Sequence, residues 1–262
     1  MTNQTALITG ASGGIGYEFA KLLARDCGTL VLVARNRERL ADVKKELEAA
    51  VQVTVITIAT DLSKPDAVDE IFREIEGRKL AVDILINNAG FGEHGAFVET
   101  EWSREEKMIA VNITALTQMT KLFVKGMIGR KSGRIVNLAS TASFQPGPFM
   151  SVYYASKAYV LSFSEAIANE LKGTGVTVTA LCPGPTATGF ALAARMENTR
   201  LFTFTKPASA AEVARYGYEA MMKGKTVAIH GVLNKILAFA VRTAPRKLLS
   251  VILRQLHEKA RS

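Results

Sequence analysis

The sequence has almost no cysteine, no paired metal-binding motif and no long apolar run. Its 262 residues include only Cys27 and Cys182, and two thiols so far apart supply neither a disulfide framework nor a zinc spacing. His230 and His257 also lack partners at metal spacing, so no metal site is expected and a reducing, cytoplasmic location is predicted. No stretch of about 18 uninterrupted apolar residues is present, which argues against a membrane span. The polar residues 1–5 lead directly into a strand-like run, so no leader is expected.

Acidic residues are scarce near the C-terminus. The chain carries a formal net charge of +9, and residues 231–262 hold seven basic residues against one acid, Glu258, which places +6 of the excess there. A nucleic-acid surface would interleave basic residues with stacking aromatics, and Phe239 is the single aromatic of this segment. No nucleic-acid partner is therefore expected. A solvated helix face is the favoured interpretation, and a weak contact with an anionic membrane or partner stays open.

Short apolar or β-branched runs alternate with longer helical patterns along most of the chain. Strands are expected at Ala6–Thr9, Thr29–Val33, Val53–Ile58, Ile84–Asn87, Arg134–Leu138, Val176–Leu181 and Thr226–Ile229. Helices are expected at Tyr17–Arg25, Asn36–Ala50, Pro65–Glu76, Ser103–Ile128, Tyr153–Lys172 and Ala210–Lys223. Strands separated by helices indicate βαβ units, and near-continuous apolar strands are typical of a parallel sheet buried on both faces. The sequence therefore predicts an α/β fold with helices on both faces of the sheet.

The last 30 or so residues follow a different pattern. Pro245 can open a helix, and an apolar stripe follows it at Leu248, Leu249, Ile252, Leu253 and Leu256. We predict that residues 231–262 form a basic amphipathic helical extension of a catalytic domain spanning residues 1–230. A surface helix packed on the domain is favoured over a helix that lies on a membrane.

A glycine-rich turn follows the first predicted strand and runs straight into a helix. Such a turn presents backbone N–H groups to a pyrophosphate only where side chains are absent. Gly10 permits the tight turn, Gly14 the close approach and Gly16 the packing of the helix on the sheet. The cofactor-binding residues predicted here are Gly10, Ser12, Gly14, Ile15 and Gly16.

The end of the second predicted strand carries no acid. In NAD enzymes an acidic residue at this place holds the ribose 2′-hydroxyl. Here the strand runs into Arg35, whose guanidinium can pair with a 2′-phosphate through charge-assisted hydrogen bonds. NADP(H) is therefore predicted to be preferred over NAD(H), and an ordinary exposed arginine is the alternative interpretation.

Tyr153 and Lys157 lie four residues apart at the start of a helical pattern, so they share one face. A phenol has a reference pKa of about 10, and a nearby ammonium would lower it. Such a pair makes a general acid for carbonyl reduction, or a base for the reverse reaction.

Ser140 lies just beyond a predicted strand, at the carboxyl edge where open α/β sheets bind ligands. Its hydroxyl can polarise a substrate oxygen, with Thr141, Ser143 and Ser151 as nearby alternatives. Asn112 interrupts an apolar helical run, so it is either hydrogen-bonded structurally or functional.

Taken together, these motifs resemble the short-chain dehydrogenase/reductase family over at least residues 5–188. The matching elements are Thr9-Gly10, Gly14 and Gly16; Asp61-Leu62; Asn87-Asn88-Ala89-Gly90; Asn112; Ser140; Tyr153 to Lys157; and Pro183-Gly184 with Thr188. The resemblance implies a doubly wound Rossmann-type sheet of seven strands. It also implies that Tyr153 is the general acid/base, that Lys157 lowers its pKa and binds the ribose, that Ser140 holds the substrate oxygen and that Asn112 anchors a water.

The resemblance implies further cofactor contacts beyond the glycine-rich turn. Asp61 would contact the adenine and Thr188 the nicotinamide carboxamide. The remaining residues carried over are Leu62, Asn88, Ala89, Gly90, Pro183 and Gly184. Arg35 matches the NADP-preferring branch of the family.

The expected function is an NADPH-dependent reductase, reversibly a dehydrogenase, whose small-molecule substrate is a ketone, an aldehyde or a secondary alcohol and is fairly apolar, such as a 3-oxoacyl compound. A segment containing Phe190, Met196, Phe202 and Phe204 is suited to close over a lipophilic substrate, although core packing explains its composition equally well. A different class, an NADP(H)-sensing regulatory or scaffold protein, is the alternative. A homo-oligomer is expected, either a tetramer or, more cautiously, a dimer through the Ser103–Ile128 and Tyr153–Lys172 helices.

Overall fold

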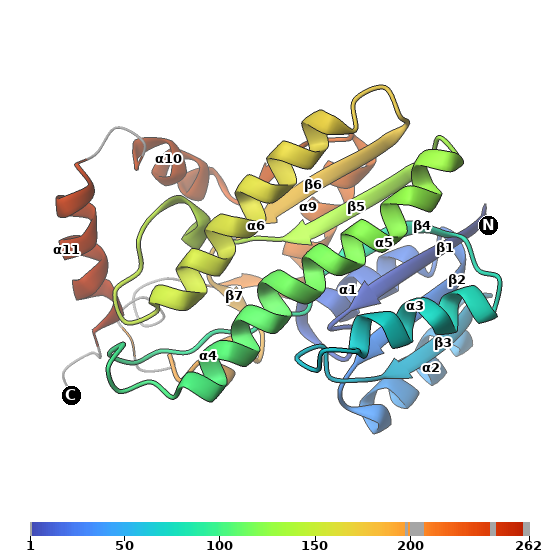
Figure 1. Ribbon diagram of the computed structural model, residues 1–262, viewed down its shortest axis with the longest axis horizontal. Helices are drawn as coiled ribbons and strands as arrows, with labels where there is room; N and C mark the ends of the chain where they lie inside the picture. The colour runs from blue at the N-terminus through green and yellow to red at the C-terminus, as the bar shows by residue number, and fades with distance from the viewer. Residues whose placement is uncertain (1, 197–198, 200–206, 242–244, 259–262) are drawn as a thin grey trace.

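Seven parallel strands form the central sheet of the computed structural model, which describes residues 2–196, 199, 207–241 and 245–258 (Figure 1). The strands are β1 (Thr2–Thr9), β2 (Cys27–Ala34), β3 (Thr54–Ala59), β4 (Val82–Asn87), β5 (Gly133–Leu138), β6 (Val176–Cys182) and β9 (Val227–Ile229). Their order across the sheet is β3-β2-β1-β4-β5-β6-β9. The predicted doubly wound sheet of seven strands is confirmed. Cys27 and Cys182 are both buried free thiols.

Two layers of helices cover the sheet, because its central strands are apolar on both faces. One layer contains α1 (Gly14–Leu23), α2 (Arg37–Ala50) and α9 (Ala210–Met222). The other contains α3 (Ala67–Gly77), α5 (Leu116–Gly129) and α6 (Ser151–Glu170). Figure 1 shows the second layer in front of the sheet. Each layer buries its apolar stripe in a separate core, so the sheet is fixed from both sides.

The predicted helix at Ser103–Ile128 is not uniform. It consists of α4 (Trp102–Ile109), a π-helical segment η1 (Ala110–Ala115) and α5 (Leu116–Gly129) in succession. The wider π-turn contains Asn112, whose side chain bonds to backbone outside the helix. Single π-turns of this kind are frequent at functional sites.

The strand order reverses direction between β1 and β4. In an open α/β sheet this switch point leaves a crevice at the carboxyl ends of the strands. Short elements surround that edge: η2 (Thr141–Phe144), α7 (Phe190–Ala193) and a two-stranded sheet of β7 (Thr186–Ala187) and β8 (Ala208–Ser209). The topology therefore brings the motifs of the first, fourth, fifth and sixth strands to one edge.

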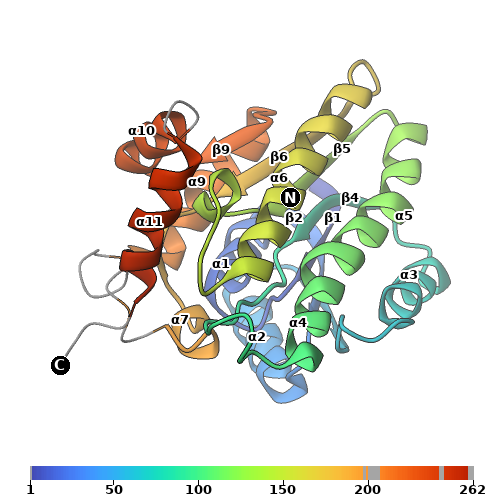
Figure 2. The ribbon, with the colours of Figure 1, turned by 60° about the vertical axis from the view of Figure 1, so that its left-hand side comes forward.

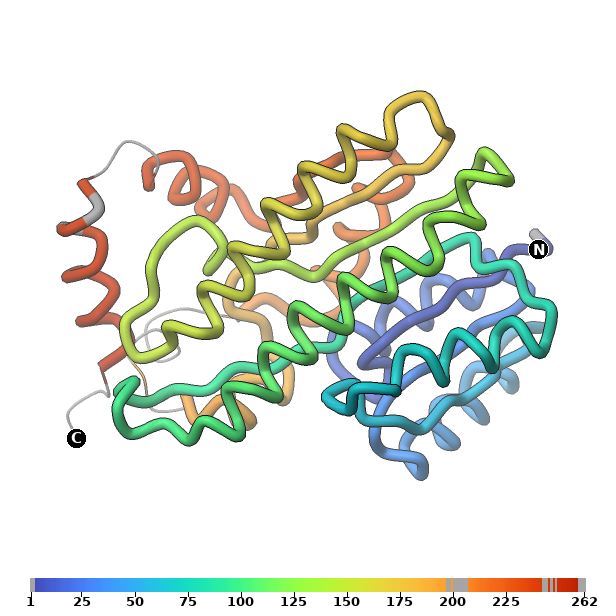
Figure 3. Tube along the Cα trace, viewed as in Figure 1, coloured from blue at the N-terminus to red at the C-terminus, as the bar shows by residue number. Residues whose placement is uncertain are grey.

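The C-terminal residues form α10 (Val232–Ala240) and α11 (Arg246–His257), which both lie at the end of the molecule reached by the carboxyl ends of the strands (Figures 2 and 3). The helix predicted after Pro245 is confirmed. Within the described ranges, every helix is too short or too polar to cross a membrane. Some residues of the sequence-based expectations lie outside the described residues. They are Phe202 and Phe204 of the expected closing segment, and Arg242, Lys259 and Arg261 among the seven basic residues of the C-terminal segment.

Candidate active site

A cavity of about 480 Å³ extends along the carboxyl ends of the central strands. Most of the predicted site residues line it. They are Gly10, Ser12, Gly14, Ile15, Arg35, Asn88, Ala89, Gly90, Ser140, Tyr153, Lys157, Pro183, Gly184 and Thr188. Four predicted residues, Gly16, Asp61, Leu62 and Asn112, do not reach its surface. The cavity therefore unites motifs that are spread over most of the chain.

Gly10 sits where two strand ends approach each other most closely. Its φ of 65° lies in the left-handed region, and a Cβ there would come within 2.7 Å of the Asn88 side-chain nitrogen. That nitrogen donates to the carbonyl oxygens of Thr9, at 2.9 Å, and Gly10, at 3.2 Å. Gly16 lies behind the turn, where a Cβ would meet Asn88 and the Gly10 carbonyl oxygen. Gly16 thus serves packing of α1 rather than direct contact with the cavity.

The N-terminus of α1 faces this turn. Its N-cap is Gly13, and among the described residues no side chain caps the first N–H groups of the helix. Unpaired N–H groups at a helix N-terminus, together with the helix dipole, form a site for an anion such as a pyrophosphate. Gly14, with a φ of 55°, leaves the space in front of these N–H groups open to an anion. A Cβ at this position would press on the Thr188 side chain.

Arg35 is exposed at the end of β2 and lines the outer part of the cavity. Sequence reasoning missed a second cation here, Arg39 on the first turn of α2, whose Nε donates to the Ser12 carbonyl oxygen at 3.3 Å.

Asp61 lies in a neighbouring depression beside Arg35 rather than in the main cavity. Its carboxylate accepts hydrogen bonds from the backbone N–H and hydroxyl of Ser63, at 3.0 and 2.9 Å. Burial raises the pKa of Asp61, but these hydrogen bonds and the charges of Arg35 and Lys107 outweigh it, so the pKa lies below its usual value. Leu62 is buried in the core. A contact of either residue with an adenine stays a prediction.

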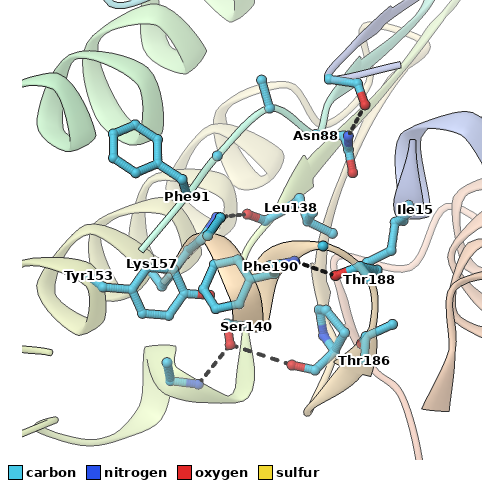
Figure 4. Close-up of a pocket in the computed structure, with 18 of the residues that line it drawn as sticks. Ile15, Asn88, Phe91, Leu138, Ser140, Tyr153, Lys157, Thr186, Thr188 and Phe190 are labelled. Carbon is cyan, nitrogen blue, oxygen red and sulfur yellow. Dashed lines mark hydrogen bonds between the residues drawn. The ribbon is translucent and has the colours of Figure 1, made fainter. Parts of the chain in front are cut away.

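Tyr153 and Lys157 occupy successive turns of α6, as the spacing predicted (Figure 4). Burial raises the pKa of Tyr153 to about 12, and its hydrogen bond with the Ser140 side chain opposes that rise. The Lys157 ammonium donates to the Leu138 carbonyl oxygen at 2.6 Å and lies 5.9 Å from the centre of the Tyr153 ring. The expectation that the lysine lowers the phenol pKa is not met in this arrangement, because burial dominates and the ammonium is turned toward Leu138.

Burial also acts on the lysine. Removal from water disfavours an ammonium, and it lowers the pKa of Lys157 to about 8. Near neutral pH the pair is thus a protonated phenol beside a cation that is close to losing its proton.

Ser140 is distinguished from its neighbours by its contacts. Its hydroxyl caps η2 by accepting from the Ala142 N–H at 3.1 Å and bonds to Tyr153. Ser143, an alternative from the sequence, donates instead to the Lys157 carbonyl oxygen at 2.8 Å. Ser143 therefore fixes the catalytic helix, while Ser140 faces the phenol.

Asn112 is fully hydrogen-bonded within the protein. Its side chain exchanges two hydrogen bonds with the backbone of Phe91, at 3.0 and 3.2 Å, and donates to the Ser156 hydroxyl at 3.0 Å. Of the two predicted possibilities, a structural role is the one the geometry displays. The bonds hold the strand β4 exit against α6, beside Lys157. A role toward a water stays a prediction.

The inner part of the cavity has an apolar wall that sequence reasoning identified only in part. Phe190 and Met196 belong to the predicted closing segment, and the Phe190 ring centre lies 5.2 Å from that of Tyr153. Phe91, Met150 and Tyr154 were missed. Their chemistry is ordinary core chemistry, so nothing in the local sequence marks them as cavity residues.

Sequence reasoning also missed His257 of α11, which does not line the cavity but bonds to Tyr154, a residue that does. Its ring is fully buried, with Nδ1 2.8 Å from the Pro148 carbonyl oxygen and Nε2 2.8 Å from the Tyr154 hydroxyl. Because a carbonyl oxygen only accepts, Nδ1 carries the proton and Nε2 accepts from Tyr154. The His257 carbonyl oxygen in turn bonds His94 at 2.8 Å. The C-terminal helix is thereby attached to the residue adjacent to Tyr153.

Comparison with known proteins identifies the constellation. Residues 4–199 match the sequence profile of the family described as short chain dehydrogenase. The chain belongs to the short-chain dehydrogenase/reductase family. It is accordingly an oxidoreductase that acts on carbonyl or alcohol groups, and a nicotinamide dinucleotide is the cofactor typical of the family.

Individual relatives of this short-chain dehydrogenase/reductase match over most of its length. The ketoacyl reductase HetN of Nostoc sp. is 34% identical over 212 residues, which cover 80% of this chain and 74% of HetN. A very-long-chain 3-oxoacyl-CoA reductase-A of Danio rerio is 34% identical over 242 residues, covering 89% and 73% of the two chains. The solved structure of a short-chain dehydrogenase from Sphingobium yanoikuyae in complex with NADPH superposes with a TM-score of 0.82 at 32% identity, covering 92% and 94%.

The residues present fit the family's dinucleotide. A Cβ at Gly10 or Gly14 would press on Asn88 or Thr188 at the turn, and the open N-terminus of α1 supplies N–H donors for a pyrophosphate. A Cβ at Gly90 would lie 3.4 Å from the Lys157 nitrogen, so the absence of a side chain at Gly90 keeps the space beside the ammonium open. The short-chain dehydrogenase/reductase thus has a continuous groove from Arg35 to Tyr153.

We predict that His257 makes this enzyme less stable in mild acid. Burial lowers the pKa of His257, outweighing the raising effect of its hydrogen bond to Pro148. Since the unfolded chain then binds the proton more readily, the stabilisation is present above about pH 6.5 and is lost as pH falls through the lower folded-state pKa. His257→Gln should lower the free energy of unfolding by about 1–3 kcal/mol at pH 7.5, because it leaves buried partners unpaired.

The measurement is the melting temperature of both proteins between pH 5 and 8. The wild-type value should fall more steeply below pH 6.5, and the partly exposed His230→Gln should behave like the wild type. Parallel pH curves for wild type and His257→Gln would contradict the assignment.

Proposed function

We propose that the protein is an NADPH-dependent reductase of a fairly apolar ketone or aldehyde, able to oxidise the corresponding alcohol in reverse. One observation carries the proposal. The buried, protonated Tyr153 phenol and the Ser140 hydroxyl meet at one end of a cavity that has Arg35 at its other end. One groove thus contains three groups that this reaction needs. Tyr153 can donate a proton to the substrate oxygen, Ser140 can donate a hydrogen bond to the same oxygen, and Arg35 can bind a phosphate.

The chemistry follows from the positions of these groups. When bound, the reduced nicotinamide supplies a hydride for the carbonyl carbon. The Tyr153 hydroxyl donates its proton to the carbonyl oxygen, while Ser140 donates a hydrogen bond to the same oxygen and stabilises its developing charge. In the oxidation direction the phenolate is the base. A phenol pKa of about 12 favours the acid role at neutral pH.

Lys157 contributes through its position rather than by acidifying the phenol. Its ammonium is held by the Leu138 carbonyl oxygen, 5.9 Å from the centre of the Tyr153 ring, and burial dominates the pKa of that phenol. Ribose binding by the same ammonium, which the family resemblance implies, is part of the proposal.

The preference for NADP(H) is supported by charge at the adenine-ribose end. Arg35 lines the cavity where β2 ends, and the sequence there holds no acid that would repel a 2′-phosphate. The Sphingobium yanoikuyae relative is described with NADPH bound.

An apolar substrate is supported by the cavity wall around Tyr153. Phe91, Met150, Phe190 and Met196 line the part nearest the phenol, and they offer no charged group to a polar substrate. Two relatives, a ketoacyl reductase and a very-long-chain 3-oxoacyl-CoA reductase, are named for acyl-chain carbonyl substrates, which supports the same class here. A 3-oxoacyl compound is therefore the first substrate class to test.

The experiment follows NADPH consumption against carbonyl compounds graded by chain length and polarity, with Tyr153→Phe in parallel. Loss of the phenolic proton should reduce kcat by at least about 100-fold, because general acid catalysis contributes on that order. NADPH binding should stay within about threefold of wild type, since the ring remains. Tight NADPH binding without turnover of any compound would instead support the sensing protein.

Arg35→Ser tests the cofactor preference. Loss of charge-assisted hydrogen bonds to a phosphate should weaken NADPH binding about 10- to 100-fold and leave NADH binding nearly unchanged. Arg37→Ser is the matched control, because Arg37 is exposed two residues further on, at the start of α2, and does not line the cavity. Titration of both cofactors by fluorescence gives the ratio. Near-equal wild-type affinities for NADPH and NADH would overturn the preference.

The lowered pKa of Lys157, about 8, predicts a pH dependence of cofactor binding. Above pH 8 the ammonium loses its proton, and a charged hydrogen bond becomes a neutral one, which should weaken NADPH binding about fivefold by pH 9.5. Lys157→Met should bind weakly with little change between pH 7 and 9.5, while Tyr153→Phe should retain the wild-type curve. A wild-type curve that is flat over this range would contradict the prediction.

A further inference from the structure

Helix α10 exposes most of its apolar side chains. Val232, Leu233, Ile236, Leu237 and Phe239 are 73%, 68%, 59%, 52% and 70% exposed, and on the neighbouring α11 Val251 and Ile252 are 56% and 44% exposed. We call these seven residues the C-terminal apolar face. Soluble surfaces rarely expose so many large apolar side chains within one short stretch of chain, and such patches mark interaction sites.

The helices are held so that this face points outward. In α10 the inward side carries the buried Ala238 and Asn234, whose side chain donates to the His230 carbonyl oxygen at 2.8 Å. In α11 the inward side carries Leu253 and His257, both buried. Because these contacts fix which side of each helix meets the domain, the exposed apolar groups cannot turn inward without breaking them.

The charge around the face identifies its occupant. Residues 231–257 contain no acidic residue, and the exposed Lys235 and Lys247 lie on the two helices, while Arg254 on α11 pairs with Glu258 at 3.8 Å. A second copy seated here would bring two segments of charge +6 together, which electrostatic repulsion opposes. An anionic lipid surface offers apolar burial and opposite charge at once.

We propose that the C-terminal apolar face docks on an anionic bilayer, with α10 and α11 lying in the membrane interface. Their lengths, nine and twelve residues, suit an interfacial position and are too short to span the hydrocarbon core. The predicted dimer through α5 and α6 would leave this face free, since those helices cover a different side (Figure 2).

Docking would place the membrane beside the active site. α11 is joined through His257 to Tyr154 and to the Pro148 backbone, which adjoin the apolar wall of the cavity. This consequence rests on the proposed function: an apolar carbonyl substrate partitioned in the lipid would be concentrated near the site that reduces it. The docking itself does not depend on the reaction.

The test is co-sedimentation of the full chain with vesicles of 70% phosphatidylcholine and 30% phosphatidylglycerol. Wild type should sediment with these vesicles and on the order of tenfold less with pure phosphatidylcholine or in 0.5 M salt, because the attraction is electrostatic as well as apolar. Leu233→Ser with Phe239→Ser should lose binding by removing apolar contact. Lys235→Gln with Lys247→Gln should lose it by removing charge.

Matched controls lie at the opposite, amino-terminal edge of the sheet. Met222→Ser removes a 47% exposed apolar side chain there, and Lys223→Gln with Lys225→Gln removes the same charge as the basic pair. Both should bind vesicles like the wild type, and NADPH binding confirms folding of every variant.

Absence of wild-type binding, or equal losses in the controls, would overturn the proposal. So would self-association abolished by Leu233→Ser with Phe239→Ser, which would assign the face to a second copy. Because the readout is sedimentation, a failure here leaves the proposed reductase activity untouched.

Discussion

The junction between the ends of β1 and β4 is the constraint on which the rest of the site depends. The Thr9 hydroxyl accepts from the N–H groups of Asn88 and Ala89, both at 3.0 Å, while the Asn88 amide bonds back to the Thr9 and Gly10 carbonyl oxygens. These bonds close the switch point of the sheet. They also leave space for glycine alone at Gly10, so the turn, the start of α1 and the groove along them are determined together.

The reacting groups are controlled by burial more than by mutual attraction. Tyr153 and Lys157 are both inside the protein, and loss of water moves the phenol and ammonium pKa values in opposite directions, to about 12 and about 8. Desolvation penalises each charged form, and the Leu138 carbonyl oxygen draws the ammonium away from a closer contact with the phenol. The arrangement favours a neutral proton donor, which is what carbonyl reduction requires.

The C-terminal segment connects the surface of the molecule to this interior. One side of α11 carries a buried histidine against Tyr154, and the other belongs to an exposed apolar face of the kind that soluble domains seldom retain. The same short helix therefore holds Tyr154, a residue of the cavity wall, and exposes apolar side chains to solvent, so the two properties are physically linked.

Local chemistry alone determined much of this protein. The alternating strands and helices predict the doubly wound sheet, the glycine spacing predicts the turn, and the interval of four places Tyr153 and Lys157 on one face, because these features follow from backbone periodicity and sterics over short distances. Tertiary structure decided what depends on residues far apart in sequence. In the folded protein the Lys157 ammonium donates to Leu138, and the Asn112 side chain bonds to the backbone of Phe91. Asp61 and Leu62 do not reach the cavity surface. His257 contacts Tyr154, which lies 103 residues away in the chain. Such contacts are set by packing of the whole fold, and no local pattern records them.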